Sequence, residues 1–126
     1  METKDKMQTS SVNEVNEVNE VKQKIINTFS KNKPIIVVDD FDRENEGDFI
    51  FPAEDITPEI IGYYLKYTSG VICCAITRER ADELNLDYMV KNNTDKNQTA
   101  FTISVDYTEN TTTGISSIDR SLTCKA

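Results

Sequence analysis

Two short apolar runs enclose an acidic segment in the first half of the chain, and this arrangement constrains the fold more than any other feature. The runs Pro34–Val38 and Phe49–Ala53 are rich in β-branched and aromatic residues, which are typical of strands. Between them, the ten residues Asp39–Asp48 hold six acids and one base. We therefore expect two strands, the first buried on both faces, that hold a charged loop at both of its ends.

The remaining patterns predict an α/β (α+β) fold with a mixed β-sheet and flanking helices. Apolar runs predict further strands over residues 71–76 and 100–107, and the second of these alternates apolar and polar residues as a half-buried strand does. Helix patterns that begin at Thr, Ser or Pro residues suited to helix starts are found later in the chain. These predicted helices cover residues 57–69, 77–84 and 116–126.

The first 17 residues are predicted to be a disordered, low-complexity tail. Their NEVNEVNEV repeat places valine at every third position, and steps of three rotate the valines off any single helix face. The domain is then expected to occupy residues 18–126 and to open with a helix over 18–29. Because the last predicted helix stops after about two turns without a C-cap, we expect the domain to be truncated at its C-terminus.

The net charge of −8 argues against a nucleic-acid partner or an anionic membrane surface. No apolar run approaches the ~18 residues that a bilayer span requires, and the N-terminus lacks the apolar core of a secretory signal. The three cysteines form no CxxC pair, so reduced thiols in a cytoplasmic protein are the expectation.

The acidic segment is where the sequence points to chemistry. Six neighbouring carboxylates repel one another unless solvent, a cation or protonation relieves them, so the segment is either a solvated loop or a cation site. Arg43 within it suits a site where a cation and an anionic substrate meet. A calcium loop beginning at Asp42 fits at its first six positions but fails at the twelfth, which is Ala53.

This segment resembles the DDxDRENEGD signature of 3,4-dihydroxy-2-butanone 4-phosphate synthase. Further blocks keep the order and spacing of that family from about Val21 to Ala126. They include Gly70-Val71-Ile72-Cys73, Thr99-Ala100-Phe101-Thr102, Thr112-Thr113-Gly114-Ile115-Ser116 and Asp119-Arg120. The resemblance implies a lyase of riboflavin biosynthesis that converts D-ribulose 5-phosphate to 3,4-dihydroxy-2-butanone 4-phosphate and formate. It also implies a homodimer that uses Mg²⁺ or Mn²⁺.

The resemblance assigns roles to residues of the acidic loop. Glu44 would be a metal ligand, Arg43 and Asp48 would contact the sugar phosphate, and Glu46 would act as a polar or acid–base group. A divalent cation suits this chemistry because it polarises a carbonyl and stabilises enediolates.

Other candidates keep two interpretations each. Cys73 is similar to a cysteine that lines the family's pocket, but it also suits a small apolar position on a strand. Thr112 and Thr113 precede a helix start, where backbone N–H groups can receive a phosphate, although a Thr-rich turn explains them equally well. Asp119 and Arg120 fit a first-turn acid and a solvated base.

The family's second metal ligand and a further catalytic residue are histidines in a later segment, and this chain contains no histidine. The chain by itself is therefore expected to be a weak or inactive enzyme. Two alternatives stay open: an inactive fragment that a partner chain completes, and an acidic module that binds divalent cations. Some family members carry a fused GTP cyclohydrolase II domain, and the sequence leaves that point open.

Overall fold

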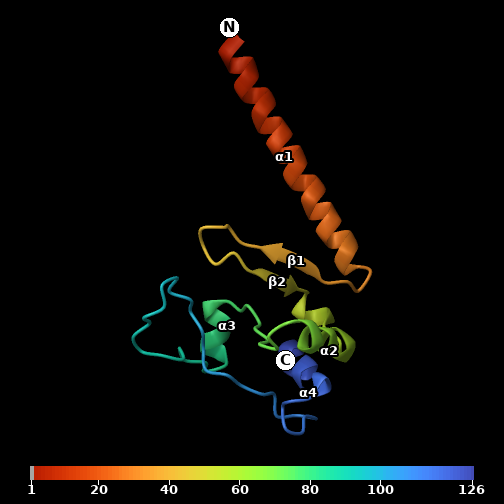
Figure 1. The fold of residues 1–126 in the computed structure, drawn as a ribbon, viewed down its shortest axis with the longest axis vertical. Coiled ribbons are helices and arrows are strands. Elements are labelled where there is room, and N and C mark those ends of the chain that lie inside the picture. Colours follow the sequence, from red (N-terminus) through yellow and green to blue (C-terminus); the bar gives the residue numbers. More distant parts are fainter. Residues whose placement is uncertain (1) are drawn as a thin grey trace. The chain divides into compact units, whose positions relative to one another are not determined.

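The computed structural model describes residues 2–126, with side chains from residue 15 onward, and opens with the long helix α1, Glu2–Phe29 (Figure 1). The predicted helix over 18–29 is present and continues back to Glu2, through most of the segment expected to be a disordered tail. Neither Gly nor Pro occurs before Pro34, and Glu, Lys, Gln and Met favour helix, so nothing in the local sequence interrupts it.

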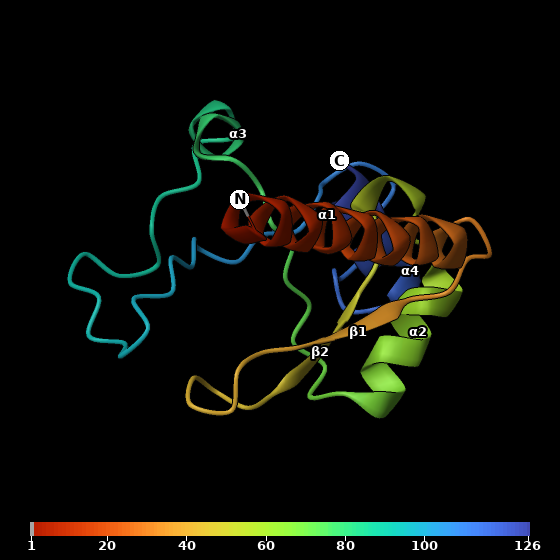
Figure 2. The ribbon, with the colours of Figure 1, turned by 90° about the horizontal axis from the view of Figure 1, so that it is seen from above.

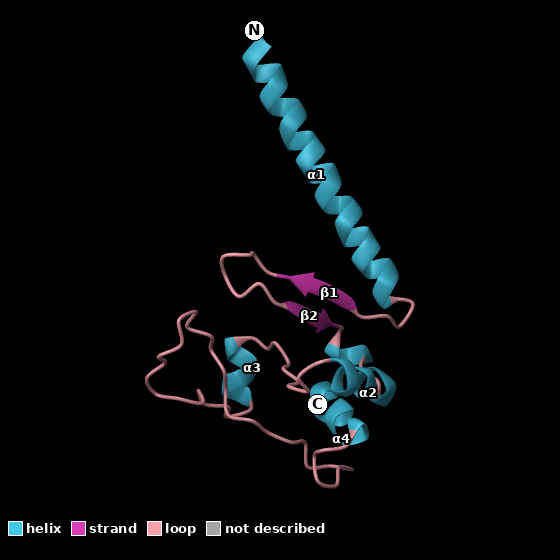
Figure 3. Cartoon of the chain, viewed as in Figure 1, coloured by secondary structure: helices cyan, strands magenta, loops and turns pink. Residues whose placement is uncertain are grey.

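A β-hairpin follows α1. Strand β1, Ile35–Val38, pairs antiparallel with β2, Gly47–Ile50, so that Val38 lies opposite Gly47 (Figure 3). The rings of Phe29 and Phe51 meet edge to face at the end of this hairpin. The expectation that β1 is buried on both faces is wrong for this structure: three of its four residues are exposed, because a two-stranded sheet has no layer over either face.

The C-terminal part is built on two helices that pack together, α2, Pro58–Tyr67, and α4, Ser117–Lys125 (Figures 1 and 2). A short 3-10 helix, Ala53–Asp55, precedes α2 and also packs on α4. The predicted caps are confirmed, since Thr57 and Ser116 each accept a backbone N–H of the helix that they begin. The core consists of Ile56, Ile60, Ile61, Tyr64 and Ala81.

The third helix, α3, Arg78–Glu83, begins at the predicted cap Thr77. The mixed sheet is not formed: residues 71–76 and 100–107 run as unpaired chain, apart from an isolated bridge between Tyr88 and Thr102 (Figure 3). A strand needs a neighbour along its length to satisfy its backbone N–H and C=O groups, and among the described residues these segments have one only at that bridge. Their apolar side chains are accordingly exposed, with Val71 at 71%.

The described chain separates into two compact units, Met1–Pro52 and Ala53–Ala126. This division differs from the tail and domain expected from the sequence, because the hairpin joins α1 in the first unit. None of the helices among residues 2–126 combines the length and apolar content that crossing a membrane requires.

Candidate functional site

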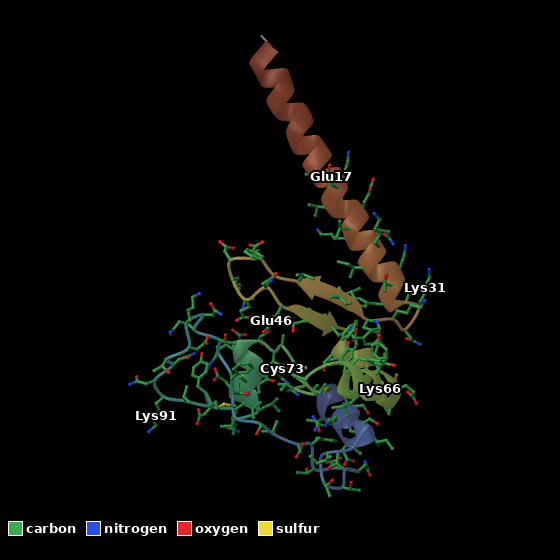
Figure 4. All side chains as sticks on the ribbon, viewed as in Figure 1. Glu17, Lys31, Glu46, Lys66, Cys73 and Lys91 are labelled. Carbon is green, nitrogen blue, oxygen red and sulfur yellow. The ribbon has the colours of Figure 1, made fainter. Side chains whose placement is uncertain are left out.

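The β1–β2 hairpin carries four of the predicted site residues. Arg43, Glu44 and Glu46 lie in the loop that joins the strands, and Asp48 lies in β2 opposite Val37. Figure 4 shows the Glu46 side chain on this hairpin. The sequence therefore correctly places these four side chains on a single short element.

The loop is held in shape by Asp39, the first residue after β1. Its carboxylate accepts hydrogen bonds from the guanidinium of Arg43 at 2.7 Å, from the N–H of Glu44 at 3.0 Å and from the N–H of Glu46 at 2.8 Å. Its own N–H donates to the carbonyl of Glu46 at 3.2 Å. Asp39 thus fixes the backbone at two of the proposed site residues and the side chain of a third.

These contacts lower the pKa of the Asp39 carboxyl. Partial burial raises the pKa of its carboxyl, but the N–H groups of Glu46 and Glu44 and the guanidinium of Arg43 outweigh that effect and hold the pKa below its ordinary value. The carboxylate is therefore ionised at neutral pH, and one of the six acidic charges is neutralised within the loop by Arg43.

The turn in this loop is made by Asn45 rather than by Gly47. Asn45 has a φ of 53°, in the left-handed region that Asn tolerates better than most residues, whereas Gly47 is an ordinary residue of β2. A Cβ on Gly47 would lie 3.5 Å from Ile36, an ordinary contact.

The acids of the hairpin loop are the candidate metal ligands, and their positions determine what they can bind. Glu44 lies 3.5 Å from the second guanidinium nitrogen of Arg43 and remains partly exposed. Among the side chains of residues 15–126, no three Asp, Glu or Cys groups converge closely enough to hold a metal ion. The described residues thus offer single carboxylate ligands and not a cluster of three.

In the C-terminal unit, Thr112 and Thr113 lie in the turn before α4. The N–H and hydroxyl of Thr112 donate to the carboxylate of Asp119 at 3.2 and 2.8 Å, and the N–H of Gly114 donates to it at 3.1 Å. Thr113 lies between these donors and is exposed. Two of the N–H groups that could receive a phosphate are therefore occupied by a carboxylate of the chain itself.

Asp119 is the site residue whose importance the sequence underestimates. It is 2% exposed, and the hydroxyl of Thr112 is the main cause of a pKa below the ordinary value, which burial opposes. From the sequence, Asp119 is expected to be a first-turn acid. Its position three residues after the cap Ser116 and five after Gly114 is the signal that could have indicated a carboxylate turned back onto the preceding loop.

The predicted cysteine Cys73 is exposed on the segment between α2 and α3, where Figure 4 labels it. Its neighbour Cys74 is also exposed. Cys124 on α4 is half-buried, and burial together with the nearby Cys74 raises the pKa of its thiol. The predicted site residues thus form two groups, one on the hairpin and one in the C-terminal unit.

Comparisons with known proteins agree in pointing to one family. The family model for 3,4-dihydroxy-2-butanone 4-phosphate synthase matches residues 23–126. The synthase of Histophilus somni is 46% identical over 104 residues, which are 82% of this chain and 49% of that protein. The riboflavin biosynthesis protein RibBA of Nocardia farcinica is 48% identical over 103 residues, again 82% of this chain but 25% of that protein.

A solved structure gives the same result for the fold. The crystal structure of a 3,4-dihydroxy-2-butanone 4-phosphate synthase in complex with two magnesium ions superposes with a TM-score of 0.76 at 42% identity, covering 82% of this chain and 48% of that chain. The chain therefore spans about half the length of that structure and of the Histophilus somni synthase, and a smaller share of the longer RibBA protein.

Proposed function

Because this chain belongs to the 3,4-dihydroxy-2-butanone 4-phosphate synthase family, we propose that its function is the formation of 3,4-dihydroxy-2-butanone 4-phosphate and formate from D-ribulose 5-phosphate in riboflavin biosynthesis. The observation that carries the proposal is a family match that runs over residues 23–126 and includes the whole acidic hairpin. The segment before residue 23 lies outside the match, which supports its separation from the catalytic domain.

The hairpin residues take distinct roles in this proposal. Arg43 and Asp48 bind the sugar phosphate, and Glu46 holds or moves a proton on it. The N–H of Glu46 is fixed by Asp39, so its backbone position does not depend on substrate. One guanidinium nitrogen of Arg43 is anchored by Asp39 and another lies 3.5 Å from Glu44, and the fork has further N–H groups that can meet an anionic oxygen.

Glu44 is the ligand that this chain contributes to a divalent cation, Mg²⁺ or Mn²⁺. When bound, such a cation would polarise the substrate carbonyl and stabilise the negative charge of an enediolate. Magnesium accepts a small number of carboxylates together with waters and substrate oxygens, so one glutamate suits a shared site. No three His, Cys, Asp or Glu side chains converge among residues 15–126, so Glu44 is proposed as one ligand of a shared site and not as part of a finished cluster.

The second group of proposed site residues belongs to the C-terminal unit. Cys73 is exposed and reachable by a ligand, and Thr113 presents an exposed side chain beside a turn that is already fixed. Thr112 contributes mainly through its bonds to Asp119. A homodimer remains part of the proposal, because the segments 71–76 and 100–107 have apolar side chains that the described residues leave exposed.

The experiment that tests the function uses a chimaera. This chain replaces the matching half of the Histophilus somni synthase, and formate release from ribulose 5-phosphate is measured with Mg²⁺. We expect the chimaera to be active and the 126-residue chain alone to be weak or inactive. Glu44→Gln should lower kcat/KM by at least about 100-fold, as expected for loss of a metal ligand. The control Glu20→Gln removes the same charge outside the family match and should change nothing.

Three outcomes separate the alternatives. An active chimaera whose activity depends on Glu44 supports the proposed lyase. A folded chimaera without activity rejects the proposed lyase function and favours the alternative that this chain is an inactive fragment. Micromolar Ca²⁺ binding by the chain alone, with no turnover in either protein, would favour the acidic cation-binding module instead.

A further inference from the structure

Asp119 stands apart from the other acids of the chain. It is the third residue of α4 and is 2% exposed, and it is the one buried charged side chain among residues 15–126. No Lys or Arg forms an ion pair with it among the described ion pairs. A buried carboxylate without a counter-ion is costly unless hydrogen bonds stabilise it, so its partners indicate what it is for.

Those partners come from the turn that carries the proposed substrate contacts and from the helix cap Ser116, two residues after it. One carboxylate oxygen accepts the N–H of Thr112, and the other accepts the Thr112 hydroxyl and the N–H of Gly114. The turn therefore wraps around the carboxylate on both sides of Thr113. The side chain of Thr113 is left on the outside and exposed.

The turn has little room to relax into another shape. Gly114 is buried and has a φ of 77°, and a Cβ added there would overlap the carboxylate of Asp106. On the other side, the hydroxyl of Thr123 accepts the N–H of Tyr107 at 3.1 Å and donates to the carbonyl of Asp119 at 3.0 Å. The segment that leads into the turn is thus tied to the same helix that carries Asp119.

The geometry points to Asp119 as a positioning residue that fixes the Thr112–Gly114 turn and thereby presents Thr113 to the substrate. This inference rests on the proposed function, and it extends that function to a residue that does not touch substrate. The carboxylate accepts the N–H groups of Thr112 and Gly114, which could otherwise bind an anion. Substrate therefore contacts Thr113 and not the helix N-terminus. The bonds form within the chain, and the turn is therefore arranged before substrate arrives.

The test uses the active chimaera described above and the substitution Asp119→Asn. Asparagine keeps the shape but puts an NH₂ donor against the N–H of Thr112 or of Gly114, so the turn cannot close as before. We expect KM for ribulose 5-phosphate to rise by about 10-fold or more with kcat within about 3-fold, because binding contacts and not reacting groups are displaced. Thr112→Val, which keeps the buried charge, should raise KM in the same direction by less.

Two controls distinguish positioning from a loss of stability. Thr57→Ala removes the N-cap of α2, which packs on α4 but donates none of the described hydrogen bonds to Asp119, so it should lower the melting temperature while KM stays unchanged. In a Thr113→Val background, Asp119→Asn should add little further rise in KM, since residues that act through one contact are not additive. This double-mutant result is one that a purely structural role would not produce.

Each outcome decides the question. A normal KM in folded Asp119→Asn, or a rise that is undiminished in the Thr113→Val background, overturns the positioning role while wild-type activity still supports the lyase. If Asp119→Asn fails to fold, an unchanged KM in Thr112→Val overturns the role instead. A folded wild-type chimaera that releases no formate overturns the proposed function and this inference together.

Discussion

Three glycines of the C-terminal unit give a quantitative test, because replacing each with alanine should have a different effect on stability. Gly62 lies inside α2, and a Cβ added there meets no atom within 4 Å. Gly70 follows α2 with a φ of 79°, and its nearest neighbour would be Leu65 at 3.8 Å. Gly114 has a similar φ of 77°, but its Cβ would overlap the carboxylate of Asp106.

The magnitudes follow from these environments. Gly62→Ala should increase the free energy of unfolding by about 0.5–1 kcal/mol, because alanine is the better helix former and has room. Gly70→Ala should decrease it by about 1–2 kcal/mol, the cost of a left-handed backbone for an L-residue. Gly114→Ala carries the same backbone cost and must also turn the exposed Asp106 side chain to another rotamer, which adds about 0.5–1.5 kcal/mol.

Urea denaturation of the 126-residue chain, followed by circular dichroism at 222 nm, measures all three changes on one scale. The expected order of midpoints is Gly62→Ala above wild type, then Gly70→Ala, then Gly114→Ala. Because Gly70 and Gly114 share their backbone geometry, the difference between these two variants isolates the packing of the turn. Equal midpoints for the two would refute the claim that the Thr112–Gly114 turn is sterically closed.

Two further predictions concern ionisable groups. The pKa values of Asp39 and Asp119 are held below the ordinary value of 3.8, so each carboxylate contributes stability that is complete above that pH and lost as the pH falls through its lower folded value. Below pH 3.8 the free energy of unfolding should therefore fall less steeply with pH in Asp39→Asn than in wild type. An acid titration followed by circular dichroism measures this difference. Iodoacetamide at pH 8 should alkylate exposed Cys73 well before half-buried Cys124, whose thiol pKa is raised, and peptide mass spectrometry would contradict the structure if the order were reversed.

Local elements were predictable from the sequence because short-range signals determine them. The caps Thr57, Thr77 and Ser116 each begin a helix where expected, and the first apolar run forms β1. The second strand is shifted: β2 covers Gly47–Ile50 instead of the expected Phe49–Ala53. Capping and strand propensity depend on a few neighbouring residues, so a single sequence is enough to recognise them.

Long-range pairing was not predictable in the same way. Residues 71–76 and 100–107 have strand-like patterns, yet a strand forms only where a partner satisfies its backbone. The described chain pairs them only at the isolated bridge between Tyr88 and Thr102. The similarity to a solved synthase at a TM-score of 0.76 shows that the course of the backbone is nevertheless that of the family. The pattern of apolar and polar residues indicates which segments can form strands. Whether they pair depends on contacts with residues far away in the sequence.

The candidate site shows the same limit for charged residues. Six acids lie between Asp39 and Asp48, and their number alone predicts that the carboxylates repel one another. The number does not indicate which of these side chains turns into the loop. In the structure Asp39 turns into the loop and accepts two N–H groups and a guanidinium, and Asp119 does the equivalent for the second turn. From the sequence, the segment that contains Asp39 is either a solvated loop or a cation site and Asp119 is a first-turn acid, because charge alone does not reveal hydrogen-bond partners.

These two carboxylates suggest how a site rich in negative charge can be arranged before a ligand binds. An acid that accepts backbone N–H groups is stabilised where it lies, so it does not need a metal to offset its charge. Asp39 then leaves Glu44 and Glu46 on a fixed backbone, as Asp119 leaves Thr113. If a cation instead organised the hairpin, Asp39→Asn would be corrected by high Mg²⁺ in the chimaera. We expect the opposite, a loss of formate release that saturating Mg²⁺ does not restore.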